Sequence, residues 1–302
     1  MKTIVALRRG GLGDLLIAAP SLHLLRVAFP VSRIILVSRP LYGILLKEAA
    51  LVDEVQDADD FKWAALSGPP AVSPPGLPEA DLAVGWFQSG SAEGYLKGAS
   101  ILWPKIPVRA FRGDPRIDKP LSRQFYAATA GGLPGPQGPR PSFEECARLQ
   151  IRLAERPAGP EPSRPYAVLH PGAGSPRKVW PADRFREIIR ALAARGFSGV
   201  IVLGEAEQSV LEEWSAAALP LDWTVRNRPD LLALAGLLSE ASFYLGNDSG
   251  VTHLSAALGV PGLALFLTEF VGAWRPLGKV EALAASEIGG ISVAAVLSRI
   301  PS

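Results

Sequence analysis

Several features that would define a class of protein are scarce in this sequence. It has one cysteine, Cys146, which excludes an intramolecular disulfide and indicates a core thiol in a reducing compartment. Its three histidines are scattered, so a zinc site with the usual ligand spacing is not expected. The 31 basic and 29 acidic residues nearly cancel. The protein is therefore not expected to bind nucleic acid, because such binding would require a clustered basic face.

Long apolar runs are also missing. No stretch approaches the roughly 18 apolar residues that a membrane-spanning helix requires. The start of the chain reaches two arginines before any long apolar run builds, unlike a secretory signal. We therefore expect a cytoplasmic protein, and peripheral contact with the inner membrane stays open.

What is present indicates two globular domains. A chain of 302 residues suits two domains of roughly 150 residues each. The Pro-rich segment 156–165 is followed at once by an apolar strand pattern, so it is the expected linker. We predict an N-terminal domain over 1–158 and a C-terminal domain over 159–302, whose last helix, within 291–300, is able to pack back on the first. The Pro/Gly-rich segment 67–78 is expected to be a mobile loop.

The apolar patterning predicts the α/β class. Runs rich in β-branched residues predict strands at 3–7, 33–38 and 81–85, and again at 166–170, 199–203, 242–245 and 263–266. Helical spacing separates them, as in the stripe after Pro181 that ends before Gly196, where Pro181 suits a first helical turn. Segment 142–153 also has a helical pattern. Alternating strands and helices predict doubly wound parallel sheets. Two such domains would place a cleft at the carboxyl ends of their strands.

The first candidate functional stretch is RRGGLGDLLIAAP, residues 8–20. Gly10, Gly11 and Gly13 follow a buried strand and precede a helix pattern from Leu15, where glycines admit a ligand close to the backbone. Neither G-x-G-x-x-G nor a P-loop spacing is present. Asp14 is an acid on this turn, and from position alone it is either a helix cap or a catalytic base.

Two further stretches in the second half suit phosphate binding. In HPGAGSPRKVWP, residues 170–181, Gly174 and Ser175 offer donors and Lys178 a positive charge; an ordinary surface loop is the alternative. In LGNDSGVTHLSAALGVP, residues 245–261, Asp248 and Ser249 precede a helix whose first amides form an anion site. His253 lies in the first turn of that helix, and local evidence favours a structural role for it.

Together these stretches resemble glycosyltransferase family 9, the bacterial lipopolysaccharide heptosyltransferases and their relatives. The matching motifs are Gly13-Asp14 with Pro20, then His170-Pro171-Gly172 with Lys178, Trp180 and Pro181, and finally Gly246 to Gly250 with His253, Leu254 and Gly259-Val260-Pro261. They occur in family order across roughly residues 1–276. The resemblance implies a GT-B fold, with two Rossmann-like domains facing across a cleft, the acceptor mainly on the first and the donor mainly on the second.

The resemblance also implies the reaction and its residues. It implies inverting, metal-independent transfer of a sugar, heptose-like or another hexose, from ADP-heptose or another nucleotide sugar to a glycan or lipid-linked acceptor, with no further cofactor. Asp14 would be the base and Lys178 would hold the phosphate. The remaining residues implied by it are Gly174, Ser175, Glu207, Asp248, Ser249, Gly250 and Val251 on the donor side and Gly11, Gly13 and His253 at the cleft or acceptor side.

Two segments depart from the family pattern. Leu267 to Phe270 replaces the usual Gly-Pro-Thr type of turn, and Arg226 to Pro229 stands where a nucleobase would rest. Other donors than ADP-heptose are therefore possible. The alternatives are a catalytically degenerate protein of the same fold that binds a nucleotide or sugar phosphate, and an NAD(P)-dependent oxidoreductase, against which the glycine spacing argues.

Overall fold

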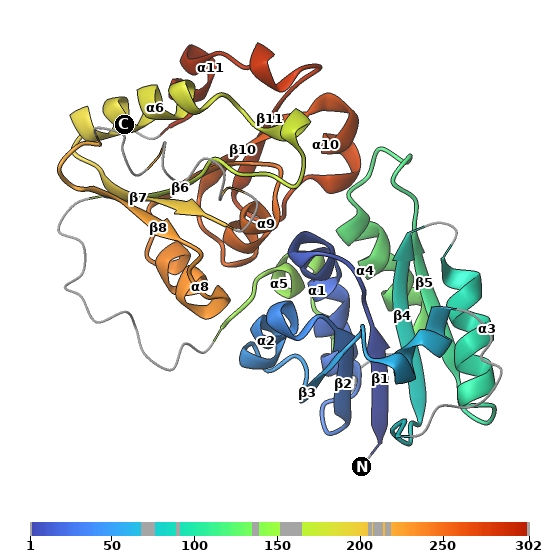
Figure 1. The fold of residues 1–302 in the computed structure, drawn as a ribbon. Helices are drawn as coiled ribbons and strands as arrows, with labels where there is room; N and C mark the ends of the chain where they lie inside the picture. Colours follow the sequence, from blue (N-terminus) through green and yellow to red (C-terminus); the bar gives the residue numbers. More distant parts are fainter. Residues whose placement is uncertain are drawn as a thin grey trace. The chain divides into compact units, whose positions relative to one another are not determined.

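The computed structural model describes residues 2–67, 76–88, 91–134, 139–151, 165–204, 207, 214 and 219–300. The chain divides into two compact units, unit 1 (Met1–Arg152) and unit 2 (Leu153–Ser302), which are described one at a time (Figure 1). The predicted domain boundary at 158/159 and residues 68–75 of the predicted mobile loop lie outside the described residues. In the described part of the chain, no helix is both long and apolar enough to span a bilayer.

Unit 1 contains a parallel sheet in the order β3-β2-β1-β4-β5. Its strands are β1 (Thr3–Leu7), β2 (Arg33–Ser38), β3 (Glu54–Asp57), β4 (Leu82–Gln88) and β5 (Val108–Gly113). Its helices are α1 (Leu12–Ala28), α2 (Pro40–Glu48), η1 (Phe61–Ser67), α3 (Ala92–Leu102), α4 (Leu121–Gly132) and α5 (Phe143–Ala147). The central strand β1 is buried on both faces, since Ile4 and Ala6 are as buried as Val5 and Leu7. Val5 and Leu7 pack in one cluster with Trp63 of η1 and Tyr95 of α3.

Unit 2 contains a parallel sheet in the order β11-β10-β9-β6-β7-β8. Its strands are β6 (Tyr166–His170), β7 (Ser198–Leu203), β8 (Trp223–Asn227), β9 (Phe243–Asn247), β10 (Gly262–Leu267) and β11 (Val280–Ala285). Its described helices are η2 (Pro176–Lys178), α6 (Ala182–Ala194), α8 (Leu231–Ser239), α9 (Gly250–Ala257), α10 (Thr268–Trp274), η4 (Ile288–Gly290) and α11 (Val293–Leu297). Figure 1 shows each sheet with its own helices beside it.

The apolar stripe of α6 forms much of the core of unit 2. Phe185, Ile188 and Leu192 are fully buried against the sheet. Trp180 belongs to the same cluster, and the last helix, α11, contributes Val296 to it. Gly196, with φ +85°, follows this helix, as its sequence position predicts. The last helix thus contacts α6 of its own unit.

The prediction of two doubly wound parallel sheets is confirmed, and every predicted strand is present. Three of them, β1, β2 and β6, have the predicted bounds, and the other four have ends shifted by up to three residues. The four strands that the sequence did not reveal, β3, β5, β8 and β11, are the four edge strands. Their residues are only partly buried, so they lack the continuous apolar run that marks a central strand.

Three helix predictions are corrected. The helix predicted over 142–153 ends at Ala147; in the described residues after it, Leu149 is buried between exposed Arg148 and Gln150, which is the alternation of extended chain. Helix α1 begins at Leu12 rather than Leu15, so Asp14 lies inside its first turn. Pro181 is the N-cap of α6 rather than a residue of its first turn.

Candidate active site

Both sheets have one point where the strand order reverses, and the predicted functional stretches follow the strands at these points. In unit 1 the reversal lies between β1 and β4, and in unit 2 between β6 and β9. Loops after two such strands leave toward opposite faces of the sheet and open a crevice at its carboxyl edge, where ligands of doubly wound folds bind. Asp14 follows β1, Lys178 follows β6 and Asp248 follows β9.

Asp14 caps the start of α1. Gly11 is the N-cap, and its backbone N–H donates to Asp14 Oδ2 at 3.0 Å. Gly10 has φ +122°, and a Cβ at that position would lie 2.6 Å from Asp14 Oδ2, so both the backbone and the carboxylate require glycine there. Asp14 is therefore not the N-cap residue itself but closes the start of α1 from the third helical position, which leaves its carboxylate 30% exposed.

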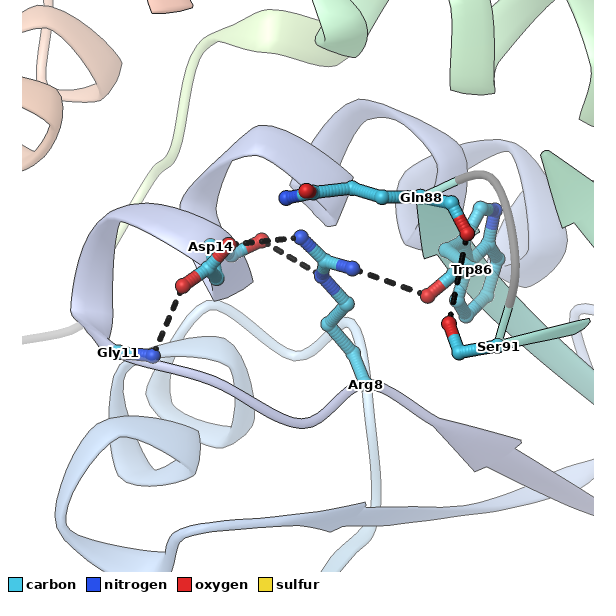
Figure 2. Close-up of polar contacts among 6 residues, drawn as sticks. All are labelled: Arg8, Gly11, Asp14, Trp86, Gln88 and Ser91. Carbon is cyan, nitrogen blue, oxygen red and sulfur yellow. Dashed lines mark hydrogen bonds and ion pairs between the residues drawn. The ribbon is translucent and has the colours of Figure 1, made fainter. Parts of the chain in front are cut away.

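Arg8 holds the same carboxylate from the other side, as Figure 2 shows. Its Nη2 donates to Asp14 Oδ1 at 3.0 Å, its Nε to the main-chain carbonyl of Asp14 at 2.9 Å, and its Nη1 to the carbonyl of Trp86 in β4 at 3.0 Å. The side chain is only 5% exposed. Burial lowers the pKa of Arg8, and the charge of Asp14 opposes that shift. Arg8 was not among the predicted site residues, although it directly follows β1 and precedes the glycine turn.

A cavity of about 350 Å³ opens beside Arg8 in unit 1. It is lined by Arg8, Trp86, Phe87 and Ser91 among others. The side chain of Gln88, at the end of β4, extends over Arg8 toward Asp14 (Figure 2), and its amide makes no hydrogen bond with any described residue. A neutral amide with unused donor and acceptor groups thus points toward the carboxylate in this view.

In unit 2 the side chain of Asn247 joins the two loops of the switch point. Its amide donates to the carbonyl of Pro171 at 2.7 Å, and its Oδ1 accepts from the backbone N–H of Trp180 at 3.2 Å. Asn247 is fully buried at the end of β9. Because one buried amide spans the 171–180 loop, the loop has a defined position against β9.

Lys178 lies between a carboxylate and an aromatic ring. Its Nζ is 2.6 Å from Asp248 Oδ2 and 4.4 Å from the centre of the Phe270 ring. The Asp248 side chain is 8% exposed and that of Lys178 24% exposed. The neighbouring Arg177 pairs with Glu269 at 3.0 Å on the surface. Phe270 and Glu269, the contacts of Lys178 and Arg177 on α10, both belong to the segment that departs from the family pattern.

Ser249 is the N-cap of α9. Its side chain accepts from the backbone N–H of Thr252, and Gly250 and Val251 form the first turn. The N–H groups of Gly250 and Val251 have no intrahelical acceptor, so they are available to an anion beside Asp248. His253, predicted as a cleft residue, is 5% exposed and belongs to the buried face of α9.

A second cavity, of about 500 Å³, lies beside the 171–178 loop of unit 2. Gly172, Gly174, Ser175, Trp180 and Glu207 are among its lining residues. The Glu207 carboxylate accepts from the backbone N–H of Gly204 at 2.7 Å and packs so closely on Gly172 that a Cβ there would lie 2.1 Å from it. The cavity therefore brings together Gly174, Ser175 and Glu207, three of the predicted donor-side residues.

Comparison with solved structures identifies the fold. The heptosyltransferase WaaC of Escherichia coli, solved with ADP, matches 98% of this chain and 98% of its own at a TM-score of 0.71 and 17% identity. The iron-containing dodecameric heptosyltransferase TibC of enterotoxigenic E. coli, in complex with ADP-D-beta-D-heptose, matches 93% of this chain and 62% of its own at a TM-score of 0.55 and 15% identity. These likenesses establish the GT-B fold.

The family follows from the sequence. The model of glycosyltransferase family 9 (heptosyltransferase) matches residues 119–289, more than half of the chain, and the chain belongs to this family. Lipopolysaccharide heptosyltransferase 1 of Pseudomonas aeruginosa is 34% identical over 188 residues, which are 58% of this chain and 52% of that protein. The chain thus spans about half the length of this relative. Family membership argues against the oxidoreductase alternative.

Proposed function

We propose that this chain is a glycosyltransferase that moves a sugar from a nucleoside-diphosphate sugar to a hydroxyl group of a glycan or lipid-linked acceptor. The observation that carries the proposal is in unit 2, where Lys178 and the start of α9 meet at the switch point through Asp248. A diphosphate requires positive charge and N–H donors, and this point offers both. The proposed donor is ADP-heptose or another nucleotide sugar, and the WaaC structures with ADP and ADP-2-deoxy-2-fluoro heptose support this class.

Glu207, Gly174 and Ser175 would bind the rest of the donor. Glu207 is fixed by the Gly204 N–H beside the 500 Å³ cavity, and an ionised carboxylate accepts hydrogen bonds from sugar hydroxyls. Gly174 and Ser175 line the same cavity with backbone and hydroxyl groups. We therefore assign Glu207 to the ribose and the 174–175 turn to the phosphates.

Asp14 would be the general base. Its carboxylate has a fixed orientation and is 30% exposed, so an acceptor hydroxyl can reach it. In the proposed step Asp14 takes the hydroxyl proton while that oxygen bonds to the anomeric carbon. The bond from that carbon to the diphosphate oxygen breaks, and the diphosphate leaves as an anion toward Lys178. Attack opposite the leaving group inverts the anomeric carbon, with Gly11, Gly13 and the Gln88 amide on the acceptor side.

This reaction requires no metal ion, because Lys178 and the α9 amides would carry the charge of the leaving group. Among the described residues, no group of three or more His, Cys, Asp or Glu side chains is suited to hold a metal. TibC is iron-containing, so cation independence is a point to be tested for this chain. We further propose action in the synthesis of lipopolysaccharide or another surface polysaccharide, in the cytoplasm and in peripheral contact with the membrane.

The test is a binding panel followed by turnover. Calorimetry with ADP, UDP, GDP and their sugars would identify the donor, and release of the nucleoside diphosphate on addition of heptose-deficient lipopolysaccharide would demonstrate transfer. We expect one nucleotide to bind and its sugar to be transferred equally with and without EDTA. Binding without transfer would favour the degenerate binding protein, and loss of transfer in EDTA would contradict the metal-independent reaction.

A further inference from the structure

We propose that Arg8 is a positioning residue for Asp14: it fixes the carboxylate at the angle from which it takes the proton of the acceptor. This role rests on the proposed function of Asp14 as the base. Arg8 contacts Asp14 twice, at the main-chain carbonyl and at Oδ1, and contacts the end of β4 through the Trp86 carbonyl. One rigid guanidinium therefore connects the start of α1 to the neighbouring strand at the switch point.

Capping α1 does not require this arginine. The chain holds a second capping box, at α5, where the Glu145 carboxylate accepts from the backbone N–H of Ser142 at 2.7 Å. Glu145 has the same position in its helix as Asp14 and forms no salt bridge with any described arginine or lysine; the Ser142 hydrogen bonds, and to a lesser degree the charge of His23, lower its pKa. An N-terminal acid that only closes a helix is thus satisfied without a buried cation, so the Arg8 pair at Asp14 serves another purpose.

The burial of Arg8 also argues for a specific role. At 5% exposure the guanidinium has lost nearly all of its water, which is costly unless its N–H groups are paired. Three hydrogen bonds and the ring of Phe125, 5.3 Å from the guanidinium carbon, compensate for it. Such a charge has one favourable position, and the carboxylate that pairs with it has one favourable orientation.

The two oxygens of Asp14 are divided between two donors. Oδ2 accepts from the Gly11 N–H and Oδ1 from Arg8, and each oxygen retains a second lone pair. Because Arg8 also lines the 350 Å³ cavity with Trp86 and Phe87, it sets where that remaining lone pair lies relative to the space in which an acceptor sugar fits. A loss of this alignment by about 1 Å is sufficient to slow a chemical step by about 10²-fold.

The test compares Arg8, which precedes α1, with a matched arginine within α1. Arg26, near the other end of α1, donates to the carbonyls of Leu51 and Ser32 and to the carboxylate of Asp53, the same combination that Arg8 makes. We would measure kcat and KM for donor and acceptor, ADP affinity by calorimetry, and thermal stability for Arg8→Ala, Arg8→Lys and Arg26→Ala. Millimolar guanidinium chloride would be added to each variant as a rescue.

We expect Arg8→Ala to lower kcat by about 10²-fold with unchanged ADP affinity, and guanidinium to restore part of the loss. Arg8→Lys, which keeps the charge without the planar fork, should fall between it and wild type. Arg26→Ala should lose stability alone, without loss or rescue of kcat. If Arg8→Ala does not fold, Arg8→Lys decides the case: its kcat should lie below the kcat of Arg26→Ala.

Two outcomes overturn the role of Arg8 while leaving the transferase intact: an active wild type whose Arg8 variants retain its kcat, or a loss that guanidinium does not restore and that Arg26→Ala shares. A wild-type protein that transfers no sugar overturns the proposed function itself, and the role of Arg8 with it.

Discussion

The ammonium group of Lys178 lies 2.6 Å from the carboxylate of Asp248, across the switch point of unit 2. The two residues are 70 positions apart in the chain and belong to the loops after β6 and β9, which only the sheet brings together. Both side chains are largely buried, so the pair is weakly screened by salt. A donor diphosphate that enters beside it would share Lys178 with Asp248.

Lys178→Ala should weaken binding of the donor's nucleoside diphosphate by about tenfold or more, because a hydrogen bond to a charged group contributes about 1.5–3 kcal/mol. Calorimetry at low and moderate salt measures the effect. Arg177→Ala is the control. Arg177 directly precedes Lys178 in the loop, and it pairs on the surface with Glu269 rather than with Asp248. Equal losses in both variants would mean that the loop contributes only general positive charge.

Phe270→Leu should weaken the same binding by a smaller amount. The ring centre is 4.4 Å from Lys178 Nζ, a cation–π contact of about 0.5–1 kcal/mol at a partly exposed site. Leucine preserves the apolar packing of α10 and removes the ring face. Phe270→Tyr retains the ring and should bind like wild type. Identical affinities for the leucine and tyrosine variants would show that the ring does not act on Lys178.

Gly172→Ala should reduce nucleotide affinity through Glu207. A Cβ at Gly172 would lie 2.1 Å from the Glu207 carboxyl group, so the carboxylate must leave its place at the Gly204 N–H. Gly289→Ala, in the same unit, has no atom within 4 Å of its added Cβ and is the matched control. We expect the loss for adenosine diphosphate to exceed the loss for inorganic pyrophosphate, which has no ribose. A uniform loss for both would assign the effect to the phosphate loop instead.

The central strands of both sheets and the switch-point motifs were predictable, because buried parallel strands are apolar throughout and glycine turns follow them directly. The edge strands β3, β5, β8 and β11 were not, since an edge strand with one partner tolerates polar residues such as Glu54 and Arg226. Pattern reasoning therefore identifies the middle of such a sheet better than its borders.

Within the candidate site, the positions of Asp14 after β1 and of Lys178 after β6 were predictable, and the side chains that they contact were not. Arg8 reads in the sequence as a surface charge at the end of a strand, and only the hydrogen bonds to Asp14 and Trp86 show why it is buried. Phe270 lies 92 residues from Lys178 in sequence, in a segment that the family pattern marked only as divergent. Such contacts depend on packing between distant segments, which no local pattern encodes.

Acidification should destabilise the folded chain through His170. This side chain is buried beside Glu207 with its Nδ1 2.9 Å from the carbonyl of Val202. Burial lowers the pKa of His170, opposed by the Val202 hydrogen bond and the charge of Glu207. A histidine with a folded-state pKa below its unfolded value of about 6.5 binds more protons when unfolded, so stability falls as the pH drops below that value.

The measurement is the urea midpoint between about pH 8 and pH 5, for wild type and His170→Asn. Asparagine keeps a donor for Val202 but does not titrate, so the urea midpoint of the variant should change less with pH at acidic pH. The variant should be less stable at neutral pH, because asparagine fills the buried site less completely than the imidazole ring. Burial also lowers the pKa of His23 in unit 1, and this contribution is common to both proteins. Parallel slopes for the two proteins would exclude His170 as the titrating group.

Asp14→Asn separates the two roles of this residue, the cap of α1 and the proposed base. Asparagine can still accept from the Gly11 N–H, so the cap should cost at most about 1 kcal/mol of stability, with some further cost because the buried Arg8 loses its counter-charge. It cannot take a proton, so kcat should fall by about 10²–10⁴-fold while donor affinity in unit 2 is unchanged. Paired denaturation and turnover measurements on Asp14→Asn and on Asp53→Asn, which removes the partner of Arg26, supply the comparison. If transfer survives in Asp14→Asn and only stability declines, Asp14 is a helix cap and another group must accept the proton.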